Sequence, residues 1–417
     1  MSLRYTLLFS IPFVTLSALL AACGDDASSR GVSSESPNAN SGATASSGGG
    51  KSTHDGSAGA LNSIVLQGGA AGSSDVGLAA AGASNPPTTW NSSKSATLTD
   101  ERLQAEYDAW KSAHVEACSN GSWVVVKDGA VVSEGIGYGM LLAAAMADLT
   151  LFEGLWKYYQ DHLDKNGLMN WATSKCEAPG NNNANAATDG DLDTAMALVQ
   201  AAARWPSAGY LPKAQALTAK IAQFESDMCA GRRVLRPGDA FGGCSATGDQ
   251  RINPSYFSPG YYKVFAHYFT EQAATWTALS DGSYQLYAIY QARLNNLVPD
   301  WSNPDGSDNG SQYWYDACRA PWRVSVDYAW TGDTRAKTFM QNVSTWVLAN
   351  GGLPKAAQQQ NSAFIGAFVL ASGYDQGKFD GYLGSWLGAE VDDAPYYQAT
   401  LRVLYLLVAA GKFSSTL

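Results

Sequence analysis

The chain has 417 residues, of which 46% are hydrophobic, and it carries a formal net charge of −10 at pH 7. This acidic balance argues against a nucleic-acid partner, because phosphates favour a basic protein surface. There are six cysteines, including Cys23, and four histidines. Their spacings match no zinc pattern, so no metal site and no cofactor is predicted. Cys229 and Cys244 are close enough in sequence to close a short disulfide loop, and an odd number of cysteines after Cys23 leaves at least one thiol free.

Residues 1–22 are typical of an export signal. Arg4 supplies a positive charge, and Leu7–Leu20 is an apolar run too short to span a bilayer comfortably. The signal ends in Leu-Ala-Ala-Cys-Gly at positions 20–24, which resembles a bacterial lipobox. We therefore predict an exported protein with a lipid on Cys23, anchored to a bacterial membrane or the cell surface or released from it. The alternative is an ordinary secretory signal.

Residues 23–95 differ from the rest in composition. Ser, Gly, Ala and Asn dominate, and aromatic residues are almost absent. Such a segment cannot bury enough apolar surface to offset its chain entropy, which predicts a flexible linker. From residue 96 to residue 417 Trp, Tyr and Leu are dense, and this length suits one large domain.

Helical spacing of apolar residues dominates that domain. Leu103, Tyr107, Trp110 and His114 are four, three and four positions apart, which places them on one face of a helix. Residues 123–127 are the best candidate for a strand. About a dozen helices favour an all-α fold, either a toroid or a solenoid. Further helices are predicted at 135–149, from 191 to about 202, and at 214–228, 259–268, 271–279, 282–296, 319–330, 334–349, 363–371 and 396–409.

Four segments carry a family resemblance. Residues 132–142 read Val-Ser-Glu-Gly-Ile-Gly-Tyr-Gly-Met-Leu-Leu, and residues 187–193 read Ala-Thr-Asp-Gly-Asp-Leu-Asp. Asn-Pro-Ser-Tyr-Phe-Ser-Pro follows at 253–259, and Tyr-Asp-Ala-Cys-Arg-Ala-Pro-Trp-Arg at 315–323. In this order they resemble segments of glycoside hydrolase family 8, with one departure at Thr194, where the family usually has Ile or Met. The resemblance covers residues 96–417 and implies an (α/α)6 barrel with an acidic cleft at one end.

Inverting glycoside hydrolysis needs a protonated carboxyl and a carboxylate base about 6.5–9.5 Å away, which leaves room for a water molecule. Glu134 is the predicted acid: apolar walls would raise its pKa, and glycines beside it would let a sugar approach. The alternative is a plain carboxylate at a helix N-terminus. For Asp327, within a mainly apolar helix, the resemblance implies the base. The alternative is an ion pair with Arg319 or Arg323.

Asp189 is expected, from the resemblance, to hold the distorted sugar at the cleavage point. Asp191 next to it is interpreted as a substrate contact or as support for Asp189. Helix capping is the alternative for both carboxylates, and the choice between them stays open. An aromatic row would stack on sugar faces, although core packing is the alternative for each ring. The predicted substrate contacts are Asp191, Tyr138, Arg319, Tyr328, Trp171 and Tyr256.

These features together predict an endo-acting, inverting hydrolase of β-1,4-glucan (cellulose or mixed-linkage β-glucan) that works as a monomer on a β-linked polysaccharide. Xylan is the second substrate candidate. An Asp at position 327 resembles the family branch with cellulases and xylanases and argues against a chitosanase. Two other classes remain as alternatives: a polysaccharide lyase, which needs a Tyr or His base, and a non-catalytic carbohydrate-binding lipoprotein.

Overall fold

The computed structural model describes residues 90–180 and 185–415. The predicted export signal at 1–22, the lipidation site Cys23 and most of the linker lie outside the described residues. Within the described part the chain forms twelve α-helices and six short strands. No helix there is both long enough and apolar enough to cross a membrane.

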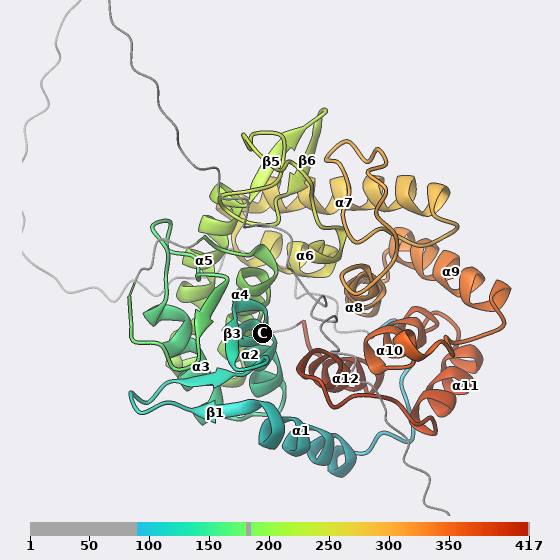
Figure 1. Cartoon of the computed structure of the whole chain (residues 1–417), viewed down its shortest axis with the longest axis horizontal. Helices are drawn as coiled ribbons and strands as arrows, with labels where there is room; N and C mark the ends of the chain where they lie inside the picture. Colours follow the sequence, from blue (N-terminus) through green and yellow to red (C-terminus); the bar gives the residue numbers. More distant parts are fainter. Residues whose placement is uncertain (1–89, 181–184, 416–417) are drawn as a thin grey trace, which may run out of the picture. The chain divides into compact units, whose positions relative to one another are not determined.

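Six helices stand side by side as an inner ring around the centre of the molecule (Figure 1). They are buried on most of their surface; in α10, for example, all ten residues are buried. This explains why their sequences read as nearly continuous apolar runs rather than as one apolar stripe. The inner helices are α2 (Ser133–Ala145), α4 (Thr188–Arg204), α6 (Pro259–Tyr268), α8 (Ala320–Thr331), α10 (Ser362–Ala371) and α12 (Tyr396–Ala409).

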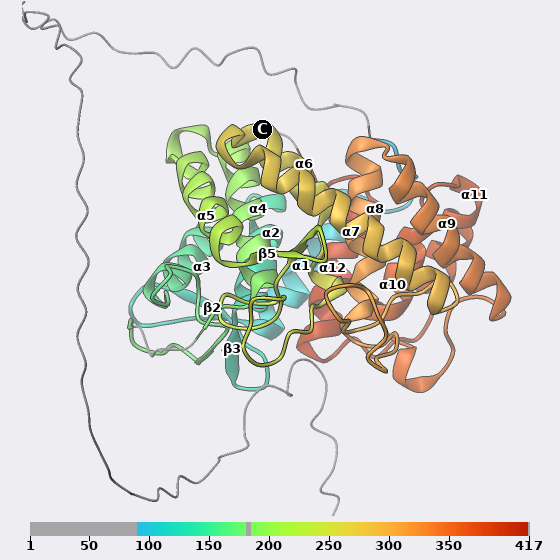
Figure 2. The same cartoon turned by 90° about the horizontal axis from the view of Figure 1, so that it is seen from above.

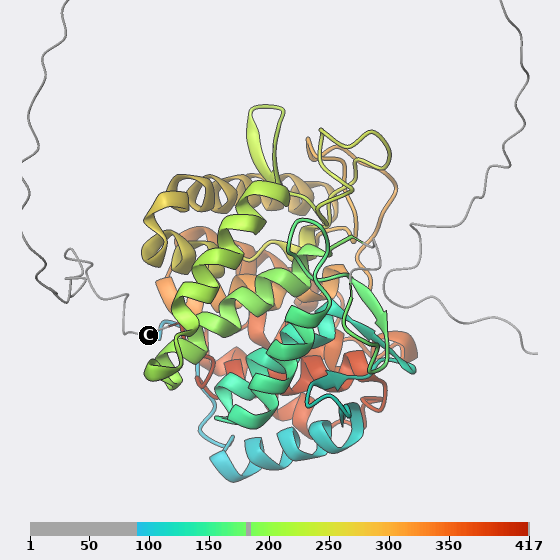
Figure 3. The same ribbon diagram turned by 90° about the vertical axis from the view of Figure 1, so that its left-hand side faces the viewer.

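Six more helices surround this ring, and each packs against an inner helix next to it in sequence or, for the first, against the last (Figures 1 and 3). They bury one face only: the first buries Leu103, Tyr107 and Trp110, as their spacing predicts. The two rings confirm the predicted all-α (α/α)6 barrel. The outer helices are α1 (Asp100–His114), α3 (Leu149–Asp161), α5 (Tyr210–Phe224), α7 (Ala273–Arg293), α9 (Thr334–Ala349) and α11 (Gln376–Leu387).

The loops that precede the inner helices carry the short strands and three of the 3₁₀ turns. The three strand pairs are antiparallel, and Val132 is in register with Ala172, so that β3 runs straight into α2. The predicted strand at 123–127 is observed at Trp123–Val125. These elements are β1 (Val115–Ala117), β2 (Trp123–Val125), β3 (Ala130–Val132), β4 (Ala172–Ser174), β5 (Ser226–Cys229), β6 (Arg232–Leu235), η2 (Pro254–Tyr256) and η4 (Ala317–Arg319).

Two disulfides brace these loops. Cys118 pairs with Cys176 across 58 residues, and Cys229 pairs with Cys244, as their spacing suggests. Cys318 keeps a free, buried thiol. The disulfides stabilise the loops mainly by restricting the unfolded chain.

The boundary between linker and domain needs a correction. Residues 90–95, which composition assigns to the linker, run along the barrel (Figure 2). The backbone N–H groups of Asn91, Ser93 and Ser95 donate hydrogen bonds to carbonyls at or just past the C-terminal ends of α8, α10 and α12. Polar composition misleads here because the segment is held by its backbone rather than by apolar side chains.

Candidate active site

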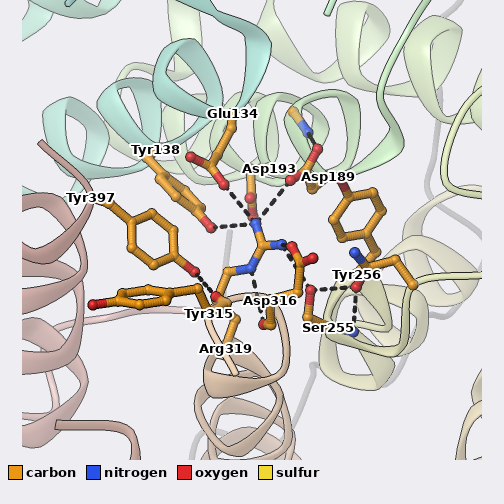
Figure 4. A network of polar contacts seen from close by, with 12 residues as sticks. Glu134, Tyr138, Asp189, Asp193, Ser255, Tyr256, Tyr315, Asp316, Arg319 and Tyr397 are labelled. Carbon is orange, nitrogen blue, oxygen red and sulfur yellow. Dashed lines mark hydrogen bonds and ion pairs between the residues drawn. The ribbon is translucent and has the colours of Figure 1, made fainter. Parts of the chain in front are cut away.

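Three carboxylates from three parts of the chain converge on Arg319, whose side chain is 2% exposed. Its Nη1 donates to Oε2 of Glu134 at 2.6 Å and to Oδ2 of Asp189 at 3.0 Å, and its Nη2 donates to Oδ1 of Asp316 at 2.7 Å (Figure 4). Glu134 and Asp189 lie in the first turns of α2 and α4, and Arg319 directly precedes α8. The cluster therefore lies at the N-terminal end of the inner ring.

The backbone around Glu134 is fixed by neighbouring strands and by close helix packing. The N–H of Ser133 donates to the carbonyl of Trp171 at 2.9 Å, which continues the β3–β4 pairing into the first turn of α2. A Cβ on Gly137 would lie 2.8 Å from the carbonyl oxygen of Gly190 in α4. This glycine therefore lets α2 and α4 approach each other, not a sugar as predicted, because it faces the neighbouring helix.

Burial sets the protonation of this cluster. The pKa of Glu134 is raised because burial disfavours its charge, although Arg319 opposes the shift and Asp189 adds to it. Oε1 of Glu134 accepts a hydrogen bond from the hydroxyl of Tyr396 at 3.1 Å. One guanidinium cannot neutralise three carboxylates, so one of them is best able to hold a proton. A protonated Glu134 with an 11% exposed side chain meets the requirements of a general acid.

Asp316 is the cluster member that the sequence reading did not assign. Its side chain is 17% exposed, more than those of Glu134 and Asp189. Burial raises the pKa of Asp316 and Arg319 opposes the shift; Trp301, whose Nε1 donates to Oδ2 at 3.0 Å, also lowers the pKa. The motif at residues 315–323 contains Asp316, which lies one helical turn before Arg319 at a helix start. This position is the feature of the sequence that could have identified it.

Asp327, the predicted base, is not part of this cluster. It follows Arg319 by eight residues, which is about 12 Å along a helix. Its side chain is 0% exposed, and Nζ of Lys263 donates to both of its oxygens at 2.8 and 2.7 Å. Tyr284 donates to Oδ2 as well. A carboxylate enclosed in this way has no access to a water and a sugar, so the assignment is corrected: Asp327 forms a buried ion pair, although with Lys263 rather than with Arg319 or Arg323.

Three other predicted substrate contacts are either buried or lie further along a helix from the cluster. Tyr328 is next to Asp327 on α8, far along the helix from Arg319. Tyr138 is fully buried, and its hydroxyl accepts a hydrogen bond from Nη1 of Arg319 at 3.4 Å, so it supports the arginine from below. Asp191 is 0% exposed and accepts hydrogen bonds from the hydroxyl of Tyr159 and the N–H of Met169. Its role is support and not contact, because a sugar cannot reach it.

Aromatic rings border the cluster. Tyr256 lies with its ring centre 5.2 Å from the Arg319 guanidinium. Trp171, 37% exposed, is joined through its backbone to Ser133, and Trp314, 40% exposed, comes two residues before Asp316. Large rings left in water near a polar cluster are typical of a ligand-binding surface. Sequence reasoning placed all three rings among the loop aromatics that could stack on a sugar and assigned substrate contacts to Tyr256 and Trp171.

Among the described residues one group approaches the geometry of a metal site: Asp227, Cys229 and Cys244. The two cysteines are joined to each other in a disulfide, so their sulfurs carry no thiolate charge to bind a metal. The carboxylates around Arg319 already have a cation.

Comparisons with known proteins point to one enzyme family. Residues 87–411 match the family model "Glycosyl hydrolases family 8". Endoglucanase A of Acetivibrio thermocellus is 34% identical over 346 residues, covering 76% of this chain and 70% of that protein. Endoglucanase 2 of Ruminiclostridium josui is 32% identical over 340 residues, covering 75% of this chain and 71% of that protein.

Solved structures share the fold. The apo structure of a β-1,3-1,4-glucanase from Paenibacillus sp. X4 superposes with a TM-score of 0.67 at 24% identity, covering 79% of this chain and 96% of that one. A reducing-end-xylose releasing exo-oligoxylanase complexed with xylobiose superposes with a TM-score of 0.64 at 15% identity, covering 76% and 95%. With the family match over most of the described domain, the chain belongs to glycosyl hydrolases family 8.

Proposed function

We propose that this enzyme cleaves β-1,4-linked glucan within the polymer chain and with inversion at the anomeric carbon. The observation that carries the proposal is the convergence of Glu134, Asp189 and Asp316 on Arg319 at the end of the barrel that Trp171 and Trp314 border. The relatives named endoglucanase support glucan as the substrate class.

The proposed mechanism divides the chemistry between two carboxyl groups. Glu134 is protonated at the start and donates its proton to the leaving glycosidic oxygen, while the bond to the anomeric carbon breaks. Asp316 takes a proton from the water that attacks the opposite face of the sugar. The two carboxyl groups bind different nitrogens of one guanidinium. An inverting reaction requires them to stand ~6.5–9.5 Å apart, with the sugar and the water between them.

Asp189 and Arg319 hold the reacting sugar and the two carboxyls in place. The side chain of Asp189 is 4% exposed, whereas that of Asp316 is 17% exposed. Asp189 is therefore less accessible to an attacking water than Asp316 and better suited to a fixed charge beside the oxocarbenium-like transition state.

The test is release of reducing ends by the full chain from carboxymethyl cellulose, lichenan, xylan and chitosan, with Glu134→Gln as the blank. We expect the highest rate on the two glucans, a steep early fall in viscosity and the inverted anomer in NMR spectra of fresh product. A preference for xylan would overturn the substrate assignment. If the folded protein released no reducing ends from any of the four polymers, the non-catalytic binding alternative would be favoured.

For localisation we propose export and lipid anchoring at Cys23, with a flexible tether up to the domain and a monomeric enzyme. The support is the residue pattern of positions 1–24 alone. Incorporation of a fatty-acid label in wild type and its loss in Cys23→Ser would test the anchor. An unlabelled wild-type protein would argue for an ordinary secretory signal. Sedimentation of the purified domain would test the monomer.

A further inference from the structure

Two consecutive residues, Asp300 and Trp301, fix Asp316 and its backbone turn. Neither residue transfers a proton in the mechanism proposed above. Oδ1 of Asp300 accepts the N–H of Trp314 at 2.9 Å and the N–H of Ala317 at 2.7 Å. These two N–H groups lie on either side of Asp316 in sequence. One buried oxygen therefore closes the turn that carries this carboxylate.

Trp301 acts on the carboxylate itself. Its indole Nε1 donates to Oδ2 of Asp316 at 3.0 Å, while Arg319 donates to Oδ1. The indole lies beneath the guanidinium of Arg251, which is 5.2 Å from the ring centre. An indole N–H can only donate, so this bond favours the ionised carboxylate over the protonated one.

The pair of residues is itself fixed by the main chain. The N–H of Asp300 donates to the carbonyl of Gln312 at 2.8 Å, and the N–H of Trp301 donates to Oγ of Ser311 at 3.0 Å. The next residue, Ser302, exchanges two backbone hydrogen bonds with Ile252. Residues that are fixed so tightly can hold another group in place.

The two residues act on Asp316 in different ways. Burial, and then the neighbouring charge of Asp316, raise the pKa of Asp300 to about 7, although its two backbone donors and Arg319 lower it. Asp300 is therefore mostly neutral where a carboxylate base titrates, and it acts on Asp316 through the backbone turn rather than through charge. The charged groups that act on Asp316 are Arg319, which lowers its pKa, and Asp189, which raises it.

We propose that Asp300 and Trp301 are positioning residues that set the place and the basicity of Asp316 during hydrolysis. Asp300 holds the backbone turn, and Trp301 holds the carboxylate and favours its ionised form. The inference rests on the proposed role of Asp316 as the base.

The pH profile of kcat/KM on soluble β-glucan tests it, because its acid limb reports the base of the free enzyme. Trp301→Phe keeps the ring but loses the donor, so the acid limb should move up by about one pH unit, the effect of one hydrogen bond to a carboxylate. Asp300→Asn keeps an acceptor oxygen and replaces a carboxyl that is mostly neutral across the acid limb, so the limb should stay in place. A limb that moves in Trp301→Phe alone would not arise from general loss of stability.

The positioning role of Asp300 is tested by kcat and KM. Asp300→Ala removes the acceptor for both N–H groups, and we expect kcat to fall by roughly 10²-fold with KM little changed, because a displaced reacting group costs about that much. Asp300→Asn should restore kcat to within a few-fold of wild type. If Asp300→Ala does not fold, Asp300→Ser decides the point: its shorter side chain withdraws the acceptor from the two N–H groups, and the same fall in kcat is expected.

Trp330→Phe is the matched control. Its indole also donates to a buried oxygen, the carbonyl of Phe413 at 2.8 Å, but it lies toward the C-terminal end of α8. Trp330→Phe should lower the stability of the protein without moving the acid limb. An unmoved limb in Trp301→Phe overturns the assignment of Trp301, and a wild-type kcat in Asp300→Ala overturns the assignment of Asp300. If Asp316→Asn keeps wild-type activity, the proposed base itself is wrong, which separates the two failures.

Discussion

Arg323 and Asp193 form a bidentate ion pair inside the barrel, one helical turn below the pair that Arg319 forms with Asp189. Nη1 and Nη2 of Arg323 donate to the two oxygens of Asp193 at 2.5 and 2.7 Å. The two side chains are 1% and 0% exposed. Both pairs join the α4 chain segment to the α8 segment with the same spacing of four residues. The Arg323–Asp193 pair therefore fixes the position of α8 along its axis relative to α4, below the reaction centre.

Breaking this lower pair should be costly. We expect Arg323→Met to lower the free energy of unfolding by about 3–5 kcal/mol, because it leaves the buried charge of Asp193 without a partner. The double variant Asp193→Leu, Arg323→Met should recover much of that loss, since both charges are removed. Urea unfolding of the three proteins measures this. A double variant less stable than Arg323→Met would contradict the account.

Mutation of Asp316 should affect activity, whereas mutation of Asp327 should affect stability. Asp316→Asn removes the base and should lower kcat by about 10²–10⁴-fold while the melting temperature changes little. Asp327→Asn should leave kcat within a few-fold but lower the free energy of unfolding by about 1–3 kcal/mol, because Lys263 loses a charged partner. Initial rates and thermal melts of both variants check this. The reverse pattern, an inactive but stable Asp327→Asn, would return the base role to Asp327.

Glu134→Gln should lower kcat by about 10²–10⁴-fold with a small change in KM, because glutamine keeps the contact with Tyr396 but has no proton to donate. The matched control is Glu116→Gln. Glu116 is a half-exposed carboxylate on β1 that pairs with Lys175 at 3.0 Å, and its loss should leave the rate unchanged. Rates on a substrate with a good leaving group add a check: such a substrate needs less proton donation, so its rate should fall less in Glu134→Gln. Equal losses on both substrates would argue against the acid role.

Stability should fall as the pH rises from about 4 to 7. Burial raises the pKa of Asp191 to about 7, and burial also raises the pKa of Glu225 next to it. The folded state therefore keeps protons that the unfolded chain releases above pH 4, so ionisation favours unfolding in that window. We expect Asp191→Asn, which keeps the acceptor oxygen for Tyr159, to flatten this slope by up to a few kcal/mol. Melting temperatures between pH 4.5 and 7.5 measure it, and an unchanged slope would refute the account.

Much of the fold was predictable because apolar spacing is a local signal. The expected helices at 259–268, 334–349 and 396–409 are observed with the same bounds. The helix α7 was predicted as two pieces, 271–279 and 282–296, with the second one beginning at Gly282. A Cβ at Gly282 would lie 2.2 Å from the carbonyl of Arg233, so this glycine serves close packing against β6 and not a break. Such a contact depends on distant residues and leaves no periodic trace.

The site was predictable in part. The motifs identified Glu134, Asp189 and Arg319, which the structure brings together. Asp327 was assigned as the base from the family resemblance, and Asp316 was given no role. Lys263, the partner of Asp327, comes from another helix, and no local pattern reveals it. Asp316 belongs to a polar turn whose importance depends on Asp300 and Trp301, 15 or more residues earlier.

Residues 90–95 bind at the C-terminal ends of α8, α10 and α12, whereas the reaction centre lies at the N-terminal ends of the inner helices. The chain thus enters the barrel at the end opposite to the reaction centre. A long polymer lying across the reaction centre therefore does not meet residues 90–95.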